Sequence, residues 1–403
     1  MRDIRLSFIL ICVCAATVGC SDNGLAPPVG HGGDGGGNGG DGGTARPDGS
    51  SGSTDAGPLP DDGFVAAPHP PLPQIPFNGG KVIGQPEVIT VTWKGDPLES
   101  QLQAFDSWLL RSAYFSQALA EYNIKSGMQE GVYSIPMPAP MTLDDTEIQA
   151  QLKSLIQNMQ IPGVNASRIY SVYVPDGTVV TNKFGGIKAY TACVDLLAYH
   201  GVGPTVSGGA IIYTVTPRCH SMGISDLDYA TWSSSAEIAK AATDPTYTGW
   251  YLKSQPGAPF GGDVASLCNN FGGPIEGHFV SAIYSNAAAK ADQRPCVPAP
   301  VGPMFGAPPT PETLQMKPGA SASTKVTVYS TGPLTKPLSL SVYGYPMNDV
   351  TVKASAAFAQ NGDQVTIDIS LSNNAKSGSM PVALLQLDSG DYHWENYVVV
   401  YVQ

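Results

Sequence analysis

A low-complexity tract near the N-terminus limits what this chain can fold into. Residues 21–76 contain mostly glycine, proline, serine and aspartate, with the run HGGDGGGNGGDGG and a proline-rich end, PHPPLPQIP. Such a segment has few apolar side chains to bury, so folding would not offset the entropy that the chain loses. We therefore expect residues 20–76 to form a flexible tether, with folded structure beginning near Phe77.

Residues 1–19 have the composition of an export signal, with two arginines followed by an apolar run over residues 6–18. The run is shorter than the ~20 residues that span a bilayer, so we expect a signal peptide rather than a permanent anchor. Its end, TVGC, resembles the lipobox of bacterial lipoproteins, in which the cysteine is lipidated and becomes the first residue. The resemblance implies lipidation at Cys20. An ordinary signal peptide cut near Gly19, with Cys20 free, is the alternative.

A lipidated Cys20 determines the expected location. Stable anchoring requires more than one acyl chain, and triacylation, including palmitate, would supply them. Ser21 follows Cys20 where an aspartate would signal retention, and in lipoprotein sorting this favours the outer membrane of a Gram-negative cell. We expect an exported protein anchored to a membrane through Cys20, at the outer membrane or cell surface.

The cysteines predict two disulfide bonds. Of seven cysteines, two fall in the predicted signal and one is the predicted lipid site. The folded part then contains Cys193, Cys219, Cys268 and Cys296. An even number in an exported chain predicts a disulfide framework, and four cysteines allow three connectivities. We favour the pairs of sequence neighbours, although spacing alone does not decide; a four-cysteine zinc site is the alternative, without any Cys-x-x-Cys pair to support it.

Charge excludes one class of partner. The chain has a formal net charge of -12 and a pI near 4.8. Nucleic-acid binding requires clustered lysine and arginine that neutralise phosphates. We therefore expect no nucleic-acid partner.

Residues 77–300 alternate between strand and helix patterns. Strands are predicted at PEVITVTW, RIYSVYVPDG, GGAIIYTVTPR and GHFVSAIYSN. One helix carries Leu102, Phe105, Leu109 and Leu110; a second begins at DDTE with Ile148, Leu152, Leu155, Ile156 and Met159 on one face; a third is SSSAEIAKAATDP. Cys193 and His200 fall in a predicted loop. The alternation predicts one α/β or α+β domain.

Residues 309–403 have a different pattern, beyond a proline-rich linker. Six or so short segments rich in β-branched residues follow one another, and Val365, Ile367, Ile369 and Leu371 alternate strictly with polar residues. This spacing predicts an immunoglobulin-like β-sandwich. Such modules usually act as spacers or binding domains.

The third helix carries a glutamate where a zinc peptidase needs one. In such a helix, histidines at i and i+4 bind one ion, and the glutamate at i+1 is the general base. With Glu237 as that base, the ligand positions are Ala236 and Lys240. A methyl group cannot bind the ion, and an ammonium group repels it.

The segments SAEIAKAATDP, GGDVASLC and FVSAIYSNAAAKADQRPC together resemble a family of exported bacterial proteins. That family has a Ser-His-Glu-x-x-Glu-Ala-Ala-Thr-Asp-Pro helix, a Gly-Glu-x-x-Asp-Leu-Cys loop and an aromatic-Ser-Asn strand. The chain is also distantly similar to the phosphate-induced (EXORDIUM-like) extracellular proteins of plants. The resemblance covers about residues 79–296 and implies a metallopeptidase-like fold.

The match to the family can be followed position by position. Glu237 corresponds to the first helix glutamate, Ala236 stands at the histidine and Lys240 at the second glutamate. Asp263 replaces the loop glutamate, Ser266 replaces the loop aspartate, and Cys268 is kept. Since two of the three polar helix positions differ, the resemblance implies a catalytically silent member of the fold.

A rearranged metal site is the competing interpretation. His200, His220 and His278, with Asp263 or Glu276, include enough ligand types for zinc. His200 is the best candidate, because the related proteins tend to have an aromatic-His pair at this position. Isolated histidines are more often hydrogen-bonded structural residues, so we expect no cofactor and keep zinc as the alternative.

These observations predict a cell-surface lipoprotein whose inactive metallopeptidase-like domain binds a protein or a glycan. One alternative is a zinc-dependent peptidase or other hydrolase with Glu237 as base, and another is a structural protein of the envelope. Clustering of His200, His278, Asp263 and Glu237 around one cleft would favour the enzyme. A solvent-facing Glu237 with scattered histidines would favour binding.

Overall fold

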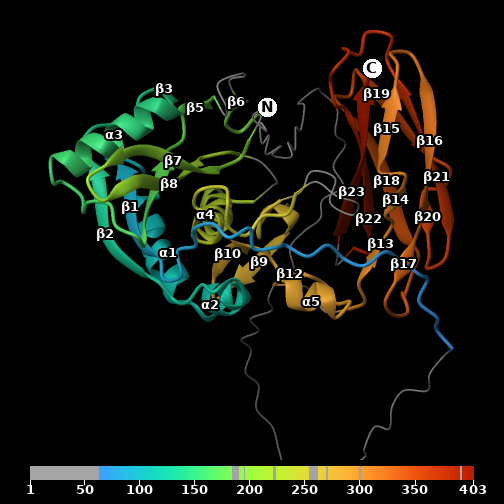
Figure 1. The fold of residues 1–403 in the computed structure, drawn as a ribbon, viewed down its shortest axis with the longest axis horizontal. Coiled ribbons are helices and arrows are strands. Elements are labelled where there is room, and N and C mark those ends of the chain that lie inside the picture. Colours follow the sequence, from blue (N-terminus) through green and yellow to red (C-terminus); the bar gives the residue numbers. More distant parts are fainter. Residues whose placement is uncertain are drawn as a thin grey trace, which may run out of the picture. The chain divides into compact units, whose positions relative to one another are not determined.

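The computed structural model describes residues 63–403 except 184–189, 195, 221–223, 254–261, 269–270, 299–301 and 391–392. The predicted signal peptide, the lipid site Cys20 and most of the predicted tether lie outside the described residues. The described chain begins with an extended segment and continues into an α/β domain and then a β domain (Figure 1).

A five-stranded sheet forms the centre of the first domain, in the order β2-β1-β4-β8-β7. The strands are β1 (Glu87–Trp93), β2 (Met128–Ile135), β4 (Arg168–Val174), β7 (Tyr199–Val206) and β8 (Gly209–Pro217). The first four strands in the sheet are parallel, and β7 is antiparallel to β8. All residues of β4 are buried, as expected for a parallel strand that is covered on both faces.

Helices cover both faces of this sheet (Figure 1). The helices are α1 (Glu99–Arg111), α2 (Ala113–Ala118), α3 (Asp145–Gln157), α4 (Asp226–Thr243) and α5 (Asn286–Lys290), with a short 3-10 turn η1 (Ala120–Tyr122). Phe105 and Leu109 of α1 share one core with Ile238 of α4. Leu152 and Leu155 of α3 belong to a second core on the other side. The predicted α/β alternation is therefore confirmed, with three layers.

Helix α3 shows how the sequence defines a helix boundary. Asp144 is the N-cap and Glu147 bonds back to its backbone N–H, which completes a capping box. The buried apolar residues are Ile148, Leu152 and Leu155, as predicted. Met159 was wrongly assigned to this face: it follows the helix with φ 55° and is 90% exposed.

Helix α4 is buried on all sides from Tyr229 to Thr243. Its sequence is rich in alanine and serine, whose small side chains let β8, β10 and α1 approach closely. A helix without a polar face is typical of the interior of a domain. The few ionisable side chains on α4 are therefore also buried.

Smaller sheets and turns complete the first domain. They are β3 (Thr142–Asp144), β5 (Val179–Asn182) and β6 (Tyr190–Thr191), the hairpin of β9 (Gly272–Ile275) and β10 (His278–Ser281), the pair β11 (Ile283–Tyr284) and β12 (Cys296–Val297), and the turn η3 (Ser266–Cys268).

The second domain consists of two facing sheets with one core between them. One sheet has the order β14-β16-β21-β19 and the other β15-β23-β22-β18-β20, beside a short pair β13-β17. The strands are β13 (Phe305–Gly306), β14 (Pro309–Thr310), β15 (Thr313–Met316), β16 (Ser321–Thr327), β17 (Tyr329–Ser330), β18 (Leu338–Tyr345), β19 (Val350–Ala354), β20 (Phe358–Ala359), β21 (Gln364–Leu371), β22 (Val382–Asp388) and β23 (His393–Val402). The alternating residues of β21 are buried, as predicted.

The end of the predicted tether is packed against the folded chain. Ile75 is buried, and the side chain of Asn286 binds both its N–H and its C=O at 2.8 Å. Asn361 likewise binds the N–H of Ala67 and the C=O of Val65. The ordered chain therefore starts before Phe77, because two asparagine side chains supply hydrogen bonds that the proline-rich segment cannot make with itself.

Candidate functional site

Two disulfide bonds hold the loops that surround helix α4. Cys193 pairs with Cys219 and Cys268 with Cys296, with Cα–Cα distances of 5.3 and 5.5 Å. These are the two neighbour pairs that the sequence favoured. The bonds are typical of an exported chain in an oxidising compartment.

Glu237 and Lys240 form a buried ion pair inside α4. Lys240 Nζ donates to Glu237 Oε1 over 2.9 Å, and the two residues are only 8% and 4% exposed. The i, i+3 spacing brings the two side chains to the same side of the helix. Glu237 is therefore a buried, hydrogen-bonded carboxylate and does not face the solvent.

The pair determines the charge of both groups. Burial alone would raise the pKa of Glu237, but the Lys240 ammonium and the His200 ring outweigh burial and hold that pKa below its usual value. Burial would likewise lower the pKa of Lys240, but Glu237 and Asp263 raise it. Both groups are therefore charged at neutral pH.

His200 lies on strand β7 and completes the cluster on the other side of Glu237. Its Nδ1 is 3.5 Å from Glu237 Oε2, which is the limit of a hydrogen bond. The ring packs at 5.0 Å from the ring of Tyr247, whose hydroxyl donates to the His200 carbonyl over 2.8 Å. His200 Nε2 is buried and has no hydrogen-bond partner within the described structure.

The sequence placed His200 in a loop, and this was wrong. Strand β7 reads YHGVGPTV, with two glycines and a proline that are rare inside strands. It nevertheless pairs with β8 through a hairpin, and its register shifts between Val202 and Thr205. The pairing with β8 therefore outweighs the weak preference of these residues for a strand conformation.

Two aspartates near the pair accept hydrogen bonds from backbone N–H groups. Asp263 Oδ1 accepts bonds from the N–H groups of Ala265 and Ser266, and it interacts electrostatically with Lys240. Asp244 ends α4 and accepts a bond from the Gly249 N–H. Burial raises the pKa of Asp244, against the effect of the Gly249 bond, and Asp263 adds to the rise. The helix predicted at SSSAEIAKAATDP therefore ends at Thr243, before the final Asp-Pro of that segment.

His278 does not join this cluster. Its ring lies 4.3 Å from that of Trp108 and 5.4 Å from that of Phe105. Glu276 accepts a bond from Trp108 Nε1 in the same place. The partial burial of His278 lowers its pKa. Of the four residues whose clustering around a cleft would favour an enzyme, the structure therefore brings together His200, Asp263 and Glu237, and it does so around the buried Lys240 ammonium.

His220 lies at the surface, beyond the carboxyl end of β8. Its two ring nitrogens are each 2.8 Å from a carboxylate, that of Asp176 and that of Asp226. These hydrogen bonds, that of Asp176 first, raise the pKa of His220. Nearby, Arg218 binds the buried Asp96 over 3.0 Å. His220 is therefore engaged by aspartates and does not point towards Glu237.

The residues at the helix do not fit a zinc ion. Among the described residues, no three His, Cys, Asp or Glu side chains are arranged to hold a metal together. Ala236 and Lys240 occupy the positions at which a zinc-peptidase helix with Glu237 as its base would have histidines, and the Lys240 ammonium lies where the positive charge of the ion would have to be added. An ion placed there would be repelled by this group.

A second buried polar network was not predicted. Asp106 accepts bonds from Thr90 over 2.7 Å and from the Tyr173 hydroxyl over 2.5 Å, and the same hydroxyl is 2.6 Å from Ser234. Burial raises the pKa of Asp106 to about 7, against the lowering effect of these bonds. An aspartate on the otherwise apolar face of α1 was the sequence feature that could have predicted this network, because a buried carboxylate needs hydrogen-bond partners.

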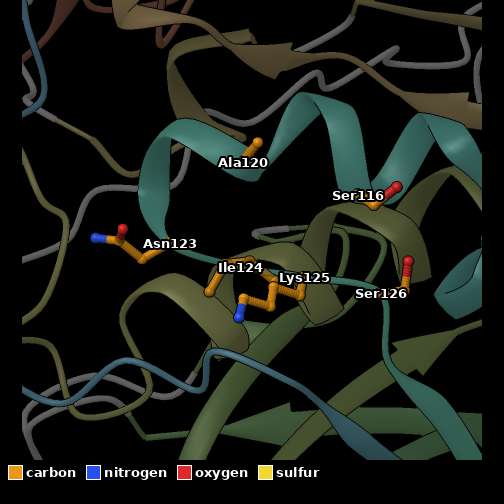
Figure 2. Close-up of a pocket in the computed structure, with 6 residues that line it drawn as sticks. All are labelled: Ser116, Ala120, Asn123, Ile124, Lys125 and Ser126. Carbon is orange, nitrogen blue, oxygen red and sulfur yellow. The ribbon is translucent and has the colours of Figure 1, made fainter.

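The described surface also has a shallow pocket of about 430 Å³, away from the cluster. It is formed by the end of α2, by η1 and by the loop that follows (Figure 2). The lining residues are Ser116, Ala120, Asn123, Ile124, Lys125 and Ser126. Lys125 is its only charged lining residue.

Comparisons with known proteins give little. No family model matches the sequence, and no curated protein matches it. Domains 4 and 5 of the S-layer protein SbsC align over 25% of this chain and 54% of theirs, at 15% identity and a TM-score of 0.20. Titin M4 aligns over 25% of this chain and 95% of its own, at 8% identity and a TM-score of 0.18. This chain spans about half the length of the S-layer chain, and likenesses this weak establish neither fold nor function.

Proposed function

We propose that this protein is a cell-surface lipoprotein whose metallopeptidase-like domain has no catalytic metal and acts by binding, together with an immunoglobulin-like sandwich. The observation that carries the proposal is the buried pair of Lys240 and Glu237. The family that the sequence resembles has a second glutamate at the position of Lys240, whereas here the ammonium supplies a positive charge inside the helix.

The charge of Glu237 argues against general-base catalysis. A base that takes a proton from water works best when its pKa is near the working pH. Lys240 and His200 together hold the pKa of Glu237 below its ordinary value, although burial opposes them. Protonation of Glu237 would also leave the Lys240 ammonium without its counter-ion in a buried site. Glu237 acts here as a structural anion.

Export is supported in this proposal by the disulfide bonds, and anchoring by the sequence of the N-terminal residues. Two disulfides are typical of exported proteins. No helix within the described ranges is long and apolar enough to span a bilayer. The signal-like residues 1–19 and the lipobox-like Cys20 supply the anchor in this proposal, and the two-sheet second domain supplies a binding surface.

The test is the zinc content of the full chain purified without chelator. We expect no bound zinc in the unmodified chain, and zinc binding in an Ala236→His, Lys240→Glu double variant, which restores the family pattern. Lys240→Met is the matched control, because it removes the cation without adding a ligand. Circular dichroism of each variant reports whether it is folded. Near-stoichiometric zinc in the unmodified chain would overturn the proposal.

A metal-dependent hydrolase is the second candidate, and one observation favours it. His200 Nε2 is buried without a partner in the described structure, as a nitrogen awaiting a ligand would be. In that case the unmodified chain would bind zinc, and His200→Ala would abolish binding while Lys240→Met would not. A zinc-free unmodified chain with unchanged stability after His200→Gln would exclude this candidate.

A further inference from the structure

The segment that precedes the first domain contacts both domains. Residues 65–75 read VAAPHPPLPQI, include four prolines, and form neither a helix nor a strand. Proline fixes φ, so a proline-rich segment is stiff and extended, with a rise of about 3.1 Å per residue. Over this length it spans about 30 Å, which is enough to reach from one domain to another. A stiff segment also loses little entropy when it docks.

The second domain holds the N-terminal end of this segment. Asn361 Oδ1 accepts a bond from the Ala67 N–H, and Asn361 Nδ2 donates to the Val65 carbonyl, both over 2.8 Å. The same Oδ1 accepts a bond from the Ser330 N–H over 3.0 Å, which fixes the asparagine side chain on its own domain. Ala67 is buried and packs against Tyr329. The second domain therefore binds the backbone of this end through a positioned side chain.

The first domain holds the other end of the segment. Ile75 is 1% exposed, and Asn286 binds both of its backbone polar groups. The Tyr284 hydroxyl donates to the Pro73 carbonyl over 2.6 Å. Just beyond this end, the chain forms a β-bridge with Trp250. This end is therefore joined to the first domain by burial, by hydrogen bonds and by chain pairing together.

His69 lies between the two ends and contacts both domains. Its ring is stacked on that of Tyr329 in the second domain, with 3.8 Å between the ring centroids and 13° between the planes. Its Nε2 lies 3.1 Å from Asp292 Oδ2 in the first domain. Leu72 packs beside the core of the first domain and beside the small cluster that contains Tyr329. The middle of the segment therefore joins the domains directly.

We propose that residues 65–75 form a clasp that holds the two domains together and opens from its second-domain end. The clasp controls the arrangement of the domains, whatever ligand they bind, so this inference does not depend on the proposed function. Val65 is 77% exposed whereas Ile75 is buried, and a segment with few buried contacts opens at a lower free energy than one with many. A pull from the predicted anchor at Cys20 would act first on the Asn361 contacts, because Val65 precedes Ile75 in the chain.

Two contacts outside the clasp also join the domains. Phe271 packs against the cores of both, and Arg294 Nη2 donates to the Pro303 carbonyl in the linker over 2.6 Å. Domains that share a small interface move relative to one another by default. Loosening the clasp therefore tests whether it, rather than these contacts, fixes the arrangement.

The experiment is a spin-label distance measurement on the full chain in detergent. The labels are attached at Lys94→Cys and Lys353→Cys, which replace one exposed lysine in each domain. The four cysteines of the folded part are in disulfides and do not take the label. We expect one narrow distance distribution in this parent chain. A His69→Ala, Asn361→Ala variant of it should broaden the distribution and populate separated domains at least about tenfold more, since two hydrogen bonds and a ring stack are lost.

Gln74→Ala is the matched control. Gln74 is exposed in the same segment and donates only to the neighbouring Pro73 carbonyl among the printed contacts of the described chain, so its loss should leave the distribution narrow. Circular dichroism checks that each variant is folded, and Asn361→Ala alone replaces the double variant should the latter not fold. A broad distribution in the parent chain would overturn the proposal, as would an equally narrow one in the variant.

Amide hydrogen exchange tests the direction of opening. In the parent chain the Ala67 amide should exchange faster than the Ile75 amide, because the second-domain end opens first. The His69→Ala, Asn361→Ala variant should accelerate exchange at Ala67 and leave Ile75 at its original rate. Equal exchange rates at the two amides of the parent chain would contradict opening from the second-domain end.

Discussion

Lys240 Nζ lies 2.9 Å from Glu237 Oε1 inside a helix that is buried on all sides. Both side chains are almost fully buried, so each charge depends mainly on the other for compensation. A buried pair of this kind contributes little net stability compared with apolar residues, but removing one partner leaves an uncompensated charge. Replacing one residue of the pair should therefore lower the free energy of unfolding more than replacing both with apolar residues.

Lys240→Met should lower the free energy of unfolding by about 3–5 kcal/mol, because Glu237 would remain buried without the Lys240 ammonium. Urea denaturation near neutral pH measures the change. Lys94→Met, at an exposed lysine after β1, is the control and should have little effect. The double variant Lys240→Met, Glu237→Leu should recover most of the loss. A loss below about 1 kcal/mol in the single variant would show that the pair is not charged.

Asp106 should make stability depend on pH in the direction opposite to a salt-bridged carboxylate. Its folded pKa of about 7 lies above the ordinary aspartate value of 3.8. Its contribution to stability is therefore fully present below the unfolded pKa and is lost as pH rises through the folded pKa. In an Asp106→Asn variant the side chain cannot ionise, so the variant lacks this pH-dependent contribution to stability.

The measurement is the difference in unfolding free energy between the unmodified chain and Asp106→Asn, taken at several pH values. Each pKa unit corresponds to about 1.4 kcal/mol, so the unmodified chain should lose several kcal/mol relative to the variant between about pH 4 and about pH 8. Comparison with the variant cancels the other titrating groups. A constant difference across this range would mean that Asp106 is already ionised in the folded chain.

Long, regular patterns were predictable and tertiary pairings were not. The apolar runs of β1, β4 and β8 and the spacing of Leu102, Phe105 and Leu109 in α1 correspond to the observed elements. Strand β2 was missed, because it lies at the sheet edge with alternately exposed residues and an internal glycine. Local sequence carries too little information where a neighbouring strand supplies the stabilisation.

The same distinction applies to the candidate site. Glu237 and Lys240 are three residues apart, so their pairing follows from helical geometry and could have been predicted. His200 reaches Glu237 only because β7 folds back on β8, a contact between distant segments. The burial of α4 decides that Glu237 is a structural anion, and burial depends on all the elements around the helix.

The two disulfides should differ in their reactivity towards reductants. Cys268 and Cys296 are both buried, whereas Cys193 is exposed beside its buried partner Cys219. Exchange requires access of a thiolate to the sulfur, so the exposed bond should open first. Thiol labelling during a titration with reductant, read by mass spectrometry, gives the order. Simultaneous opening of both bonds would indicate global unfolding instead.

Loss of the buried Cys268–Cys296 disulfide should lower the free energy of unfolding more than loss of the other disulfide. Its cysteines are 28 residues apart, and a Cys268→Ser, Cys296→Ser variant should lose about 3–4 kcal/mol of unfolding free energy by the chain-entropy relation. Serine also places two hydroxyls in an apolar core, which adds to the loss. The corresponding variant at Cys193 and Cys219 is the control for loop length, since its separation of 26 is nearly equal. Equal losses in the two variants would contradict a contribution from burial.

Asn286 should control the order of the segment that precedes the first domain. It is the partner of both backbone polar groups of Ile75, so Asn286→Ala removes two hydrogen bonds while alanine still suits the first turn of α5. Each hydrogen bond contributes about 1 kcal/mol to stability. Loss of the two bonds should therefore make hydrogen exchange at the Ile75 amide at least about tenfold faster. Asn361→Ala is the reciprocal control, since it should accelerate exchange at Ala67 instead. Unchanged exchange at Ile75 would mean that burial of its side chain, rather than Asn286, holds this segment in place.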